Sequence, residues 1–334
     1  MKIRRTGTLA AIIVLLIIIV GFVRVFRAHP VHTGKLEELT LGTPVSDDST
    51  LIYVAYERGY FRNQGLKVTL KDYPSGASAA AGLTKGAVDV AAAAEFVFVN
   101  HVLNKDDVNI FGTIVAANNG ELVARKDHGI ERPADLKGKK IGVLPRSSGE
   151  FFFGTFLAFN DIPLSAVHTV NLGFEEMAEA LSKGTVDAVA GFSPYLFEIK
   201  RRLETLAISW PIQHEQDFYF VLMSKNGFTK TRPEAVKKLL RALVQAEEFA
   251  KAHPVDARAI LQKRLGFGSD EVAAMWRQDR FDVRLPQNLL LLMEDETRWA
   301  RERLDPKVAM PDYLSFVYQQ GLEAVRPEAV GIIH

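Results

Sequence analysis

The sequence of 334 residues contains no cysteine. Disulfide bonds, cysteine-ligated zinc, iron–sulfur clusters and a thiol nucleophile are therefore all excluded. The absence is also compatible with a protein that works outside a bacterial cytoplasm.

The chain also has almost no net charge. It contains 41 basic and 40 acidic residues, and a net charge of +1 leaves no basic footprint for nucleic acid. The composition, 48% hydrophobic and 24% charged, is typical of a globular protein. Because 334 residues exceed the length of one average domain, we expect two lobes.

The sequence motifs of common enzymes are missing as well. No His-Glu-x-x-His, Walker loop or Gly-x-Ser-x-Gly element is present. The eight histidines are scattered, and the neighbouring pair His29 and His32 lies beside the predicted membrane segment. We therefore expect a protein that is not an enzyme, with no catalytic residues, no metal site and no cofactor.

One long apolar run lies near the N-terminus, at residues 9–23, and basic residues flank it on both sides. It is shorter than the roughly 20 residues of an average spanning helix but close to the lower limit of about 17. Phe26 stands where a cleavage site needs a small residue, so we expect an uncleaved signal-anchor and linker over residues 1–34. The excess of basic residues before the run places the N-terminus in the cytoplasm and the body on the periplasmic or extracytoplasmic face of the inner membrane. A cleaved secretory signal is the alternative.

Strands and helices alternate after this segment. Apolar stretches at 39–42, 66–70 and 88–93 predict strands, and the patterns at 50–59 and 77–83 predict helices. The same rhythm resumes at 140–144 and continues through residue 189. This order predicts an α/β fold with parallel sheets and helices on both faces.

The C-terminal third has a different pattern. Pro233–Ala252 is an amphipathic segment with proline in its first turn, a favoured position. Further helices are predicted at about 256–264, 270–277 and 287–303. We expect this region to be helical cladding with no new sheet.

An internal repeat relates two parts of the chain. Leu-Thr-Lys-Gly-Ala-Val-Asp-Val-Ala-Ala at 83–92 matches Leu-Ser-Lys-Gly-Thr-Val-Asp-Ala-Val-Ala at 181–190. Each copy predicts a helix end, a glycine stop, an aspartate-bearing turn and a buried strand. The repeat favours two lobes of one design.

The loops that follow the predicted strands are the candidate ligand site, because ligands bind beyond the carboxyl ends of parallel strands. Small hydroxyl and glycine residues at two helix starts favour an anionic or acceptor-rich ligand group, and simple N-capping is the alternative. Glu95 follows four alanines and either accepts a hydrogen bond from the ligand or is a solvated residue at a helix start. Phe192 either stacks against the ligand or packs in the core. The candidate residues are Ser46, Asp47, Ser75, Gly76, Ala77, Glu95, Arg146, Ser147, Ser148, Gly149, Phe174, Phe192, Ser193 and Tyr195.

Four segments carry a resemblance to a known family. They are Glu-Arg-Gly-Tyr-Phe at 57–61 with Gln-Gly-Leu-Lys-Val at 64–68, the two repeat segments, and Asp-Leu-Lys-Gly-Lys-Lys-Ile-Gly-Val at 135–143. With them the chain resembles the nitrate/sulfonate/taurine-type substrate-binding proteins of ABC transporters, over about residues 39–223. The family has the type II periplasmic binding fold and shares a superfamily with pyrimidine-precursor synthases.

The resemblance implies two lobes that close on a small-molecule ligand, and an ABC transporter permease as the partner. Lobe I would comprise residues 35–123 and 222–334, and lobe II residues 124–221. Hinge strands would cross between the lobes near 121–125 and 218–223.

The candidate loops differ from those of family members that bind small oxyanions, because Arg146 is their only basic residue. A zwitterion, an amine-bearing sulfonate or carboxylate, or a neutral polar heterocycle fits these loops better than nitrate. Two other functions remain open: a membrane-anchored ligand-sensing subunit, and a pyrimidine-precursor-synthase-like enzyme. The synthases carry a cysteine-rich segment that this chain lacks.

Overall fold

The computed structural model describes residues 33–303, 307 and 309–333. The predicted signal-anchor falls on residues 1–32, outside the described residues. Within the part that is described, no helix is both long enough and apolar enough to cross a bilayer.

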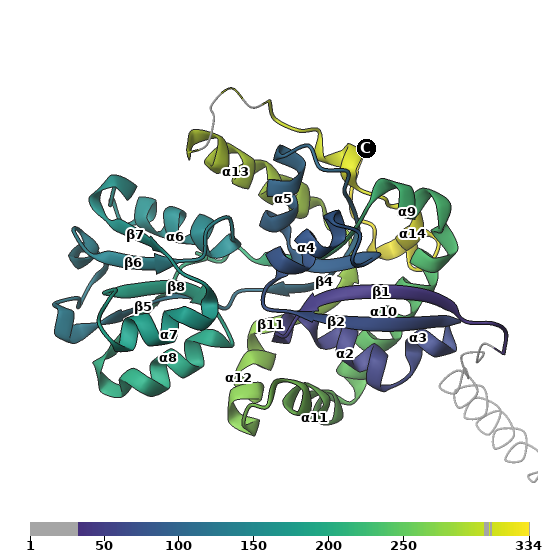
Figure 1. Cartoon of the computed structure of the whole chain (residues 1–334), viewed down its shortest axis with the longest axis horizontal. Helices are drawn as coiled ribbons and strands as arrows, with labels where there is room; N and C mark the ends of the chain where they lie inside the picture. The colour runs from purple at the N-terminus through teal and green to yellow at the C-terminus, as the bar shows by residue number, and fades with distance from the viewer. Residues whose placement is uncertain (1–32, 304–306, 308, 334) are drawn as a thin grey trace, which may run out of the picture.

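The chain forms two β-sheets with helices packed on them (Figure 1). The first sheet has six strands in the order β11-β4-β10-β3-β1-β2, and the second has five in the order β7-β6-β8-β5-β9. We call each sheet with its helices a lobe. The strands are β1 (Glu37–Pro44), β2 (Leu66–Tyr73), β3 (Val90–Ala94), β4 (Asn109–Ala117), β5 (Gly120–Arg125), β6 (Lys140–Val143), β7 (His168–Asn171), β8 (Ala188–Phe192), β9 (Ala207–Pro211), β10 (Phe218–Ser224) and β11 (Asp279–Arg284).

The two sheets share one strand order. If β11 is set aside, β2-β1-β3-β10-β4 in the first sheet corresponds to β7-β6-β8-β5-β9 in the second. The sequence repeat falls on equivalent elements: the helices α4 (Gly76–Thr84) and α7 (Phe174–Ser182), followed by β3 and β8. The repeat thus corresponds to two copies of one helix–strand unit, one in each lobe.

Helices cover both faces of the second sheet. Figure 1 shows α6 (Ser148–Phe159) on one side, with α7 and α8 (Tyr195–Leu203) on the other. The strands alternate accordingly, because Val123 packs with the cluster on α7 and α8 while Leu122 and Ala124 belong to the cluster that includes α6.

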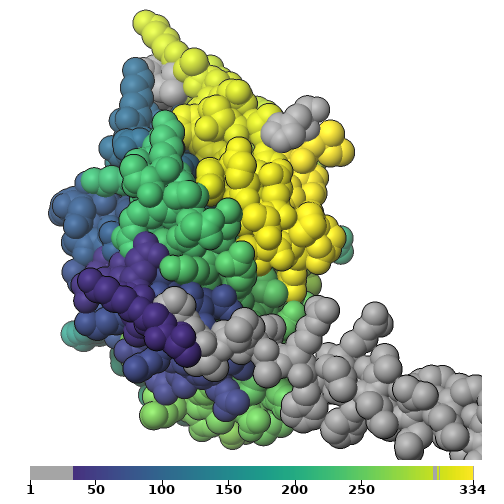
Figure 2. All heavy atoms as spheres, turned by 90° about the vertical axis from the view of Figure 1, so that its right-hand side faces the viewer, coloured from purple at the N-terminus to yellow at the C-terminus, as the bar shows by residue number. Residues whose placement is uncertain are grey.

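In the first lobe, α4 packs on β1 and β3, α13 packs on α5, and the long α10 packs against α2, α3 and β11. The helices not yet placed are α2 (Thr50–Glu57), α3 (Tyr60–Asn63), α5 (Glu95–Leu103), α9 (Asn226–Thr231), α10 (Pro233–Ala252), α11 (Pro254–Leu265), α12 (Ser269–Gln278), α13 (Gln287–Arg303) and α14 (Gln320–Glu323). The residues after α13 return to this lobe, where Val317 bridges to Ile110 of β4. Figure 2 shows this C-terminal segment in yellow over one face of the first lobe.

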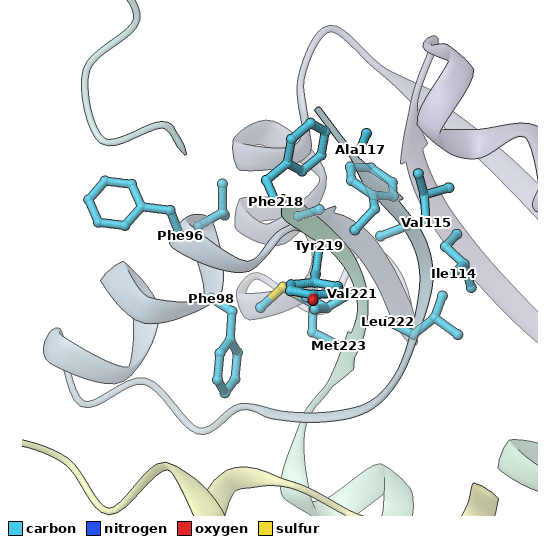
Figure 3. Packing of buried hydrophobic residues seen from close by; sticks show 14 of the residues in the cluster. Phe96, Phe98, Ile114, Val115, Ala117, Phe218, Tyr219, Val221, Leu222 and Met223 are labelled. Atoms are coloured by element: carbon cyan, nitrogen blue, oxygen red, sulfur yellow. The ribbon is translucent and has the colours of Figure 1, made fainter. Parts of the chain in front are cut away.

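The core of the first lobe centres on β10. Figure 3 shows side chains of α5, β4 and β10 packed into one cluster. Phe96, Phe98, Val221 and Leu222 are at most 1% exposed there. Burial of one such aromatic or aliphatic side chain contributes about 1.5–3 kcal/mol, so the strand that enters from the other lobe is held firmly in the sheet.

The prediction of parallel sheets was wrong, and the prediction of helical cladding with no new sheet in the C-terminal third missed one strand. The sheets are mixed, because β10 runs antiparallel to β3 and β4, and β5 runs antiparallel to β8 and β9. β5 and β10 are the strands that follow a crossing between lobes, so each starts at the edge where the parallel strands end. The C-terminal third also adds β11 to the edge of the first sheet, where alternating charged residues at 280, 282 and 284 obscured the strand pattern.

The chain crosses between the sheets at residues 118–119 and 212–217. The stretches expected to act as hinge strands, 121–125 and 218–223, lie within β5 and β10 as regular strands of the sheets. The predicted lobe boundaries at 123/124 and 221/222 therefore fall inside strands, a few residues after the crossings.

Candidate functional site

A cavity lies between the lobes, at the carboxyl ends of β1, β3, β6 and β8. The space open to the centre of a water-sized sphere is about 70 Å³, and by this measure one water molecule needs roughly 10–15 Å³. Its walls are formed by Pro44, Ser46, Asp48, Ser75, Gly76, Ala77, Ala94, Val97, Leu144, Ser147, Ser148, Phe174, Phe192, Ser193, Tyr195, Phe218 and Phe220.

Ten of the fourteen candidate residues line this cavity. They are Ser46, Ser75, Gly76, Ala77, Ser147, Ser148, Phe174, Phe192, Ser193 and Tyr195. The other four, Asp47, Glu95, Arg146 and Gly149, are not part of the lining.

The start of α4 forms one wall. Ser75 is the N-cap, and its Oγ accepts a hydrogen bond from the Ser78 N–H at 3.2 Å. At Gly76, a Cβ would lie 2.9 Å from the Cα of Ala93, so glycine lets the helix start against β3. Ser75 is therefore both a capping residue and part of the cavity wall.

The start of α6 forms the corresponding wall in the second lobe. Ser147 is the N-cap, accepting from the Glu150 N–H at 3.4 Å and donating to the Leu144 carbonyl at 2.7 Å. Ser148 is 2% exposed, and its Oγ has no hydrogen-bond partner among the described residues. A buried hydroxyl without a partner costs free energy, so this group is available to a ligand.

Aromatic side chains form the apolar part of the cavity. Phe174 and Tyr195 stack with ring centroids 4.9 Å apart and an interplanar angle of 16°. Phe192 of the second lobe meets Phe218 of the first edge to face, with centroids 5.0 Å apart. These rings present flat apolar surfaces to a ligand.

The loop after β1 brings two carboxyl groups to the site. Asp48 lines the cavity, and its Oδ2 accepts from Ser46 Oγ at 3.3 Å. Asp47 is fully buried beside it, and neither carboxylate oxygen has a hydrogen-bond partner in the part of the chain that the structure describes. Burial raises the pKa of Asp47 to about 6. Burial, together with the charges of Asp47 and Glu95, raises the pKa of Asp48 well above its ordinary value.

Glu95 lies behind the wall. It is fully buried, so it is not a solvated residue at a helix start, and its Oε2 accepts from the Tyr219 N–H at 2.6 Å. Burial raises the pKa of Glu95 to about 7, although hydrogen bonding with the carboxyl of Glu296 and with the Tyr219 N–H acts in the opposite direction. Glu95 thus connects α5 to β10 and to α13, and does not face the cavity.

Arg146 and Gly149 support the α6 loop. Arg146 is exposed, with a φ of 56°, and its N–H donates to Glu150 Oε2 at 2.8 Å. Gly149 is packed under Phe192, whose ring carbon would lie 3.3 Å from a Cβ at this position. Because Arg146 is outside the lining, none of the lining residues is basic.

Sequence reasoning missed seven lining residues. Pro44, Asp48, Ala94 and Leu144 belong to strand ends or loops that were considered, and Val97 is in the first turn of α5. Phe218 and Phe220 had no local signal, because they reach the site only through the antiparallel insertion of β10 beside β3.

Comparison with known proteins identifies the family to which the chain belongs. Residues 46–257 match the sequence profile described as NMT1/THI5 like, which is more than half of the chain. The chain belongs to the NMT1/THI5-like family. The sequence resemblance to sulfonate-type binding proteins is confirmed at this level.

One sequence relative and two solved structures can be compared with this NMT1/THI5-like protein. A protein of Bacillus subtilis (strain 168), provisionally named as an aliphatic sulfonates-binding protein, is 28% identical over 239 residues, covering 66% of this chain and 67% of that protein. The alkanesulfonate-binding protein SsuA from Xanthomonas axonopodis pv. citri, bound to MOPS, superposes with a TM-score of 0.75 at 17% identity over 86% of this chain and 100% of that one. The desulfurization enzyme DSZB superposes with a TM-score of 0.63 at 16% identity over 87% of this chain and 99% of that one. These two structures show the two-sheet fold of periplasmic binding proteins, which is shared by an enzyme.

The lobes of the NMT1/THI5-like chain touch across the cavity. The Tyr195 hydroxyl of the second lobe donates to the Pro74 carbonyl of the first at 3.3 Å. Away from the cavity, Arg303 of α13 pairs with Glu150 of α6 at 3.0 Å. Within the described ranges, no three His, Asp or Glu side chains are grouped so that they could hold a metal ion. The arrangement can enclose, stack on and hydrogen-bond a small organic molecule.

Proposed function

We propose that this protein is an extracytoplasmic solute-binding protein that captures a small polar ligand between its lobes and delivers it to an ABC transporter. The observation that carries the proposal is the cavity, because equivalent loops of two repeated units contribute to its walls. A site shared by two lobes couples ligand binding to their relative position, and the closed form is what a permease would recognise. The sulfonate-binding names of relatives support the same class of function.

The lobes in this proposal move about the two crossings. Both crossings are short, and Gln213 of the second crossing joins it to the two residues that flank the first. The Gln213 Oε1 accepts from the Gly120 N–H at 2.7 Å, and its Nε2 donates to the Ala117 carbonyl at 3.0 Å. Bending at this paired crossing would open the cavity, with the Tyr195–Pro74 contact broken and the strand order of each sheet kept.

The proposed location follows from the N-terminal sequence. An uncleaved signal-anchor over residues 1–34 would keep the lobes at the outer face of the inner membrane, beside the permease. Expression of the full chain in a bacterium, followed by carbonate extraction of membranes, tests the anchor. Retention in the membrane with the N-terminal segment intact by mass spectrometry supports it, whereas a shortened, freely released protein would establish a cleaved signal.

The binding function is tested by thermal shift on the body from Lys35 onward, after ligand removal by unfolding and refolding. The panel includes taurine, alkyl sulfonates, nitrate, amino acids and pyrimidines. A ligand at a hundred times its Kd stabilises the protein by about 2.7 kcal/mol, which is a readily measured shift. Ser148→Ala should weaken a hit about tenfold because it removes the free hydroxyl in the wall, whereas the exposed Ser165→Ala serves as the control and should not. Absence of any shift across the panel would count against solute binding.

A further inference from the structure

The cavity has two chemically different ends. The starts of α4 and α6 contribute Ser75 and Ser148, where free N–H groups and helix dipoles favour a negative group. The loop after β1 contributes Asp48, with Asp47 directly behind it. An anion alone would satisfy the first end and leave the second unpaired.

Among the residues that the structure describes, no basic group pairs with the acids at this end of the cavity. The charged groups that raise the pKa of Asp48 are Asp47 and Glu95, and those that act in the same direction on Asp279 of β11 are Asp47 and Asp48. Both oxygens of Asp47 and Oδ1 of Asp48 are buried without hydrogen-bond partners in the described part of the chain. Buried acceptors of this kind are costly unless a donor reaches them.

A second observation, independent of the acids, shows that the site is prepared for a ligand. Ser148 lines the same cavity from the opposite lobe, and its buried hydroxyl is unpartnered among the described residues. Unsatisfied groups therefore stand on both sides of one space, acceptors on the first lobe and a hydroxyl at a helix start on the second.

Resting on the proposed function, we infer that the ligand carries a cationic nitrogen with N–H donors, which binds Asp48 with Asp47 as the supporting charge, while its acceptor group binds at the α4 and α6 helix starts. The ligand is thus a small amine-bearing, zwitterionic or cationic molecule, and not a simple sulfonate or nitrate ion. Asp48 is the specificity-determining residue, because it is the acid in direct contact with the cavity.

Matched probe pairs test this inference by isothermal titration of the ligand-free body. Each pair differs only in replacing an amine by a hydroxyl: 3-aminopropanesulfonate and 3-hydroxypropanesulfonate, β-alanine and 3-hydroxypropanoate, benzylamine and benzyl alcohol. We expect at least one amine to bind, at least tenfold more tightly than its hydroxyl partner. Equal or tighter binding of a hydroxyl partner would overturn the cationic subsite while leaving solute binding intact.

The variant Asp48→Asn completes the test. Asparagine keeps the size of the side chain and an acceptor for Ser46, so the fold should be retained, as checked by circular dichroism. The preference for the amine should fall below threefold in this variant and return in Asp48→Glu. The control is Glu175→Gln, an exposed acid at the start of α7 that is outside the lining, and it should keep the full preference. Full preference in Asp48→Asn would show that Asp48 is not the subsite.

If no probe binds, a ligand that copurifies with the protein provides a second test. The protein purified without unfolding is denatured, and released small molecules are identified by mass spectrometry. A released molecule with a basic nitrogen supports the inference, and one without it overturns it. If nothing is released and no probe binds, the cavity is not a solute site and the proposed function fails together with the subsite.

Discussion

The two lobes share a scaffold but differ in the chemistry of one loop. Leu41 and Gly42 of β1 pair with β3 as Ile141 and Gly142 of β6 pair with β8. Counted from these positions, Asp47 and Asp48 of the first lobe correspond to Ser147 and Ser148 of the second. The loop after this strand thus carries acids in the first lobe and hydroxyls in the second.

The aspartates that the repeat does share have a structural role. Asp89 accepts from the Thr40 N–H at 2.7 Å, and Asp187 accepts from the Lys140 N–H at 2.7 Å. The Asp89 carboxylate holds β1 beside β3, and the Asp187 carboxylate holds β6 beside β8. The comparison separates the shared aspartates, which are partnered, from the residues that differ between lobes. Among the latter, Asp47, Asp48 and Ser148 have buried oxygens without partners in the described part of the chain, and Asp48 and Ser148 line the cavity.

The largest effect is expected when the second lobe is given the chemistry of the first. Ser148→Asp would bury another unpaired carboxylate near Asp48 and destabilise the protein by on the order of 3 kcal/mol at pH 7.5. Chemical denaturation measures the loss. The exposed Ser165→Asp, in the same lobe, is the control and should change stability by less than about 0.5 kcal/mol. Equal losses in the two variants would mean that the position of the acid does not matter.

Removal of a buried acid from the first lobe should stabilise the protein. Burial raises the pKa of Asp47 from 3.8 to about 6. Between pH 3.8 and about 6, Asp47 is therefore protonated in the folded state and ionised in the unfolded state. Stability from this group is therefore highest at low pH and decreases as pH rises from about 4 to 6. Asp47→Asn should remove this slope and raise the free energy of unfolding at pH 7.5 by on the order of 2–3 kcal/mol.

This pH effect arises in a crowded acidic region, so the neighbouring groups need to be considered. Asp48 lies on the same loop, and Glu95 on α5, Asp279 on β11 and Glu296 on α13 all have raised pKa values as well. Urea unfolding at pH 5.0 and 7.5 for the wild type and Asp47→Asn gives the difference in slope. An unchanged slope in the variant would assign the pH dependence to these other carboxyls.

Asp187, one of the two shared aspartates, should show the opposite dependence of stability on pH. The pKa of Asp187 is lowered, by hydrogen bonds from the Lys140 N–H and His128 that outweigh its partial burial, so its contribution to stability is present above the unfolded pKa and is lost at low pH. Asp89→Ala and Asp187→Ala should each cost about 1–3 kcal/mol at pH 7.5, because a strand N–H loses its acceptor. The exposed Glu248→Ala on α10 is the control in the same denaturation series. A loss in only one lobe would show that the two copies of the unit are not equivalent.

The smallest effect concerns the contact between the lobes. Tyr195→Phe removes one hydrogen bond, to the Pro74 carbonyl, while keeping the stack on Phe174. A bound probe should dissociate roughly two- to fivefold faster, corresponding to less than about 1 kcal/mol. Stopped-flow measurement of probe release compares the dissociation rate of Tyr195→Phe with that of the control Tyr56→Phe. Tyr56 is 47% exposed and lies outside the cavity lining. An unchanged rate would show that this contact does not hold the lobes closed.

Much of the fold could be predicted because it depends on local patterns. The predicted bounds of α10 and α13 agree with the structure, since apolar spacing and, for α10, the proline at its start define them. The repeat located α4 with β3 and α7 with β8. Strand-end loops led to ten of the seventeen residues that line the cavity, because parallel strands bring their carboxyl ends to one edge.

The missed features are those that depend on distant parts of the chain. The direction of β5 and β10 is decided by where the chain crosses between lobes, and no pattern within the strands records it. Glu95 was placed at the ligand because an apolar neighbourhood suggested a missing partner, and its neighbours in the fold are Tyr219 and Glu296, more than a hundred residues away.

The sequence by itself determined the alternation of strands and helices, the duplication of one unit and the loops that meet at the site, because all three follow from periodicity and repeated residues. Only the tertiary structure decided which polar groups remain without partners. Asp47, Asp48 and Glu95 are all acids beside predicted strand ends, and their roles differ because burial and hydrogen bonding depend on what the rest of the chain packs against each one.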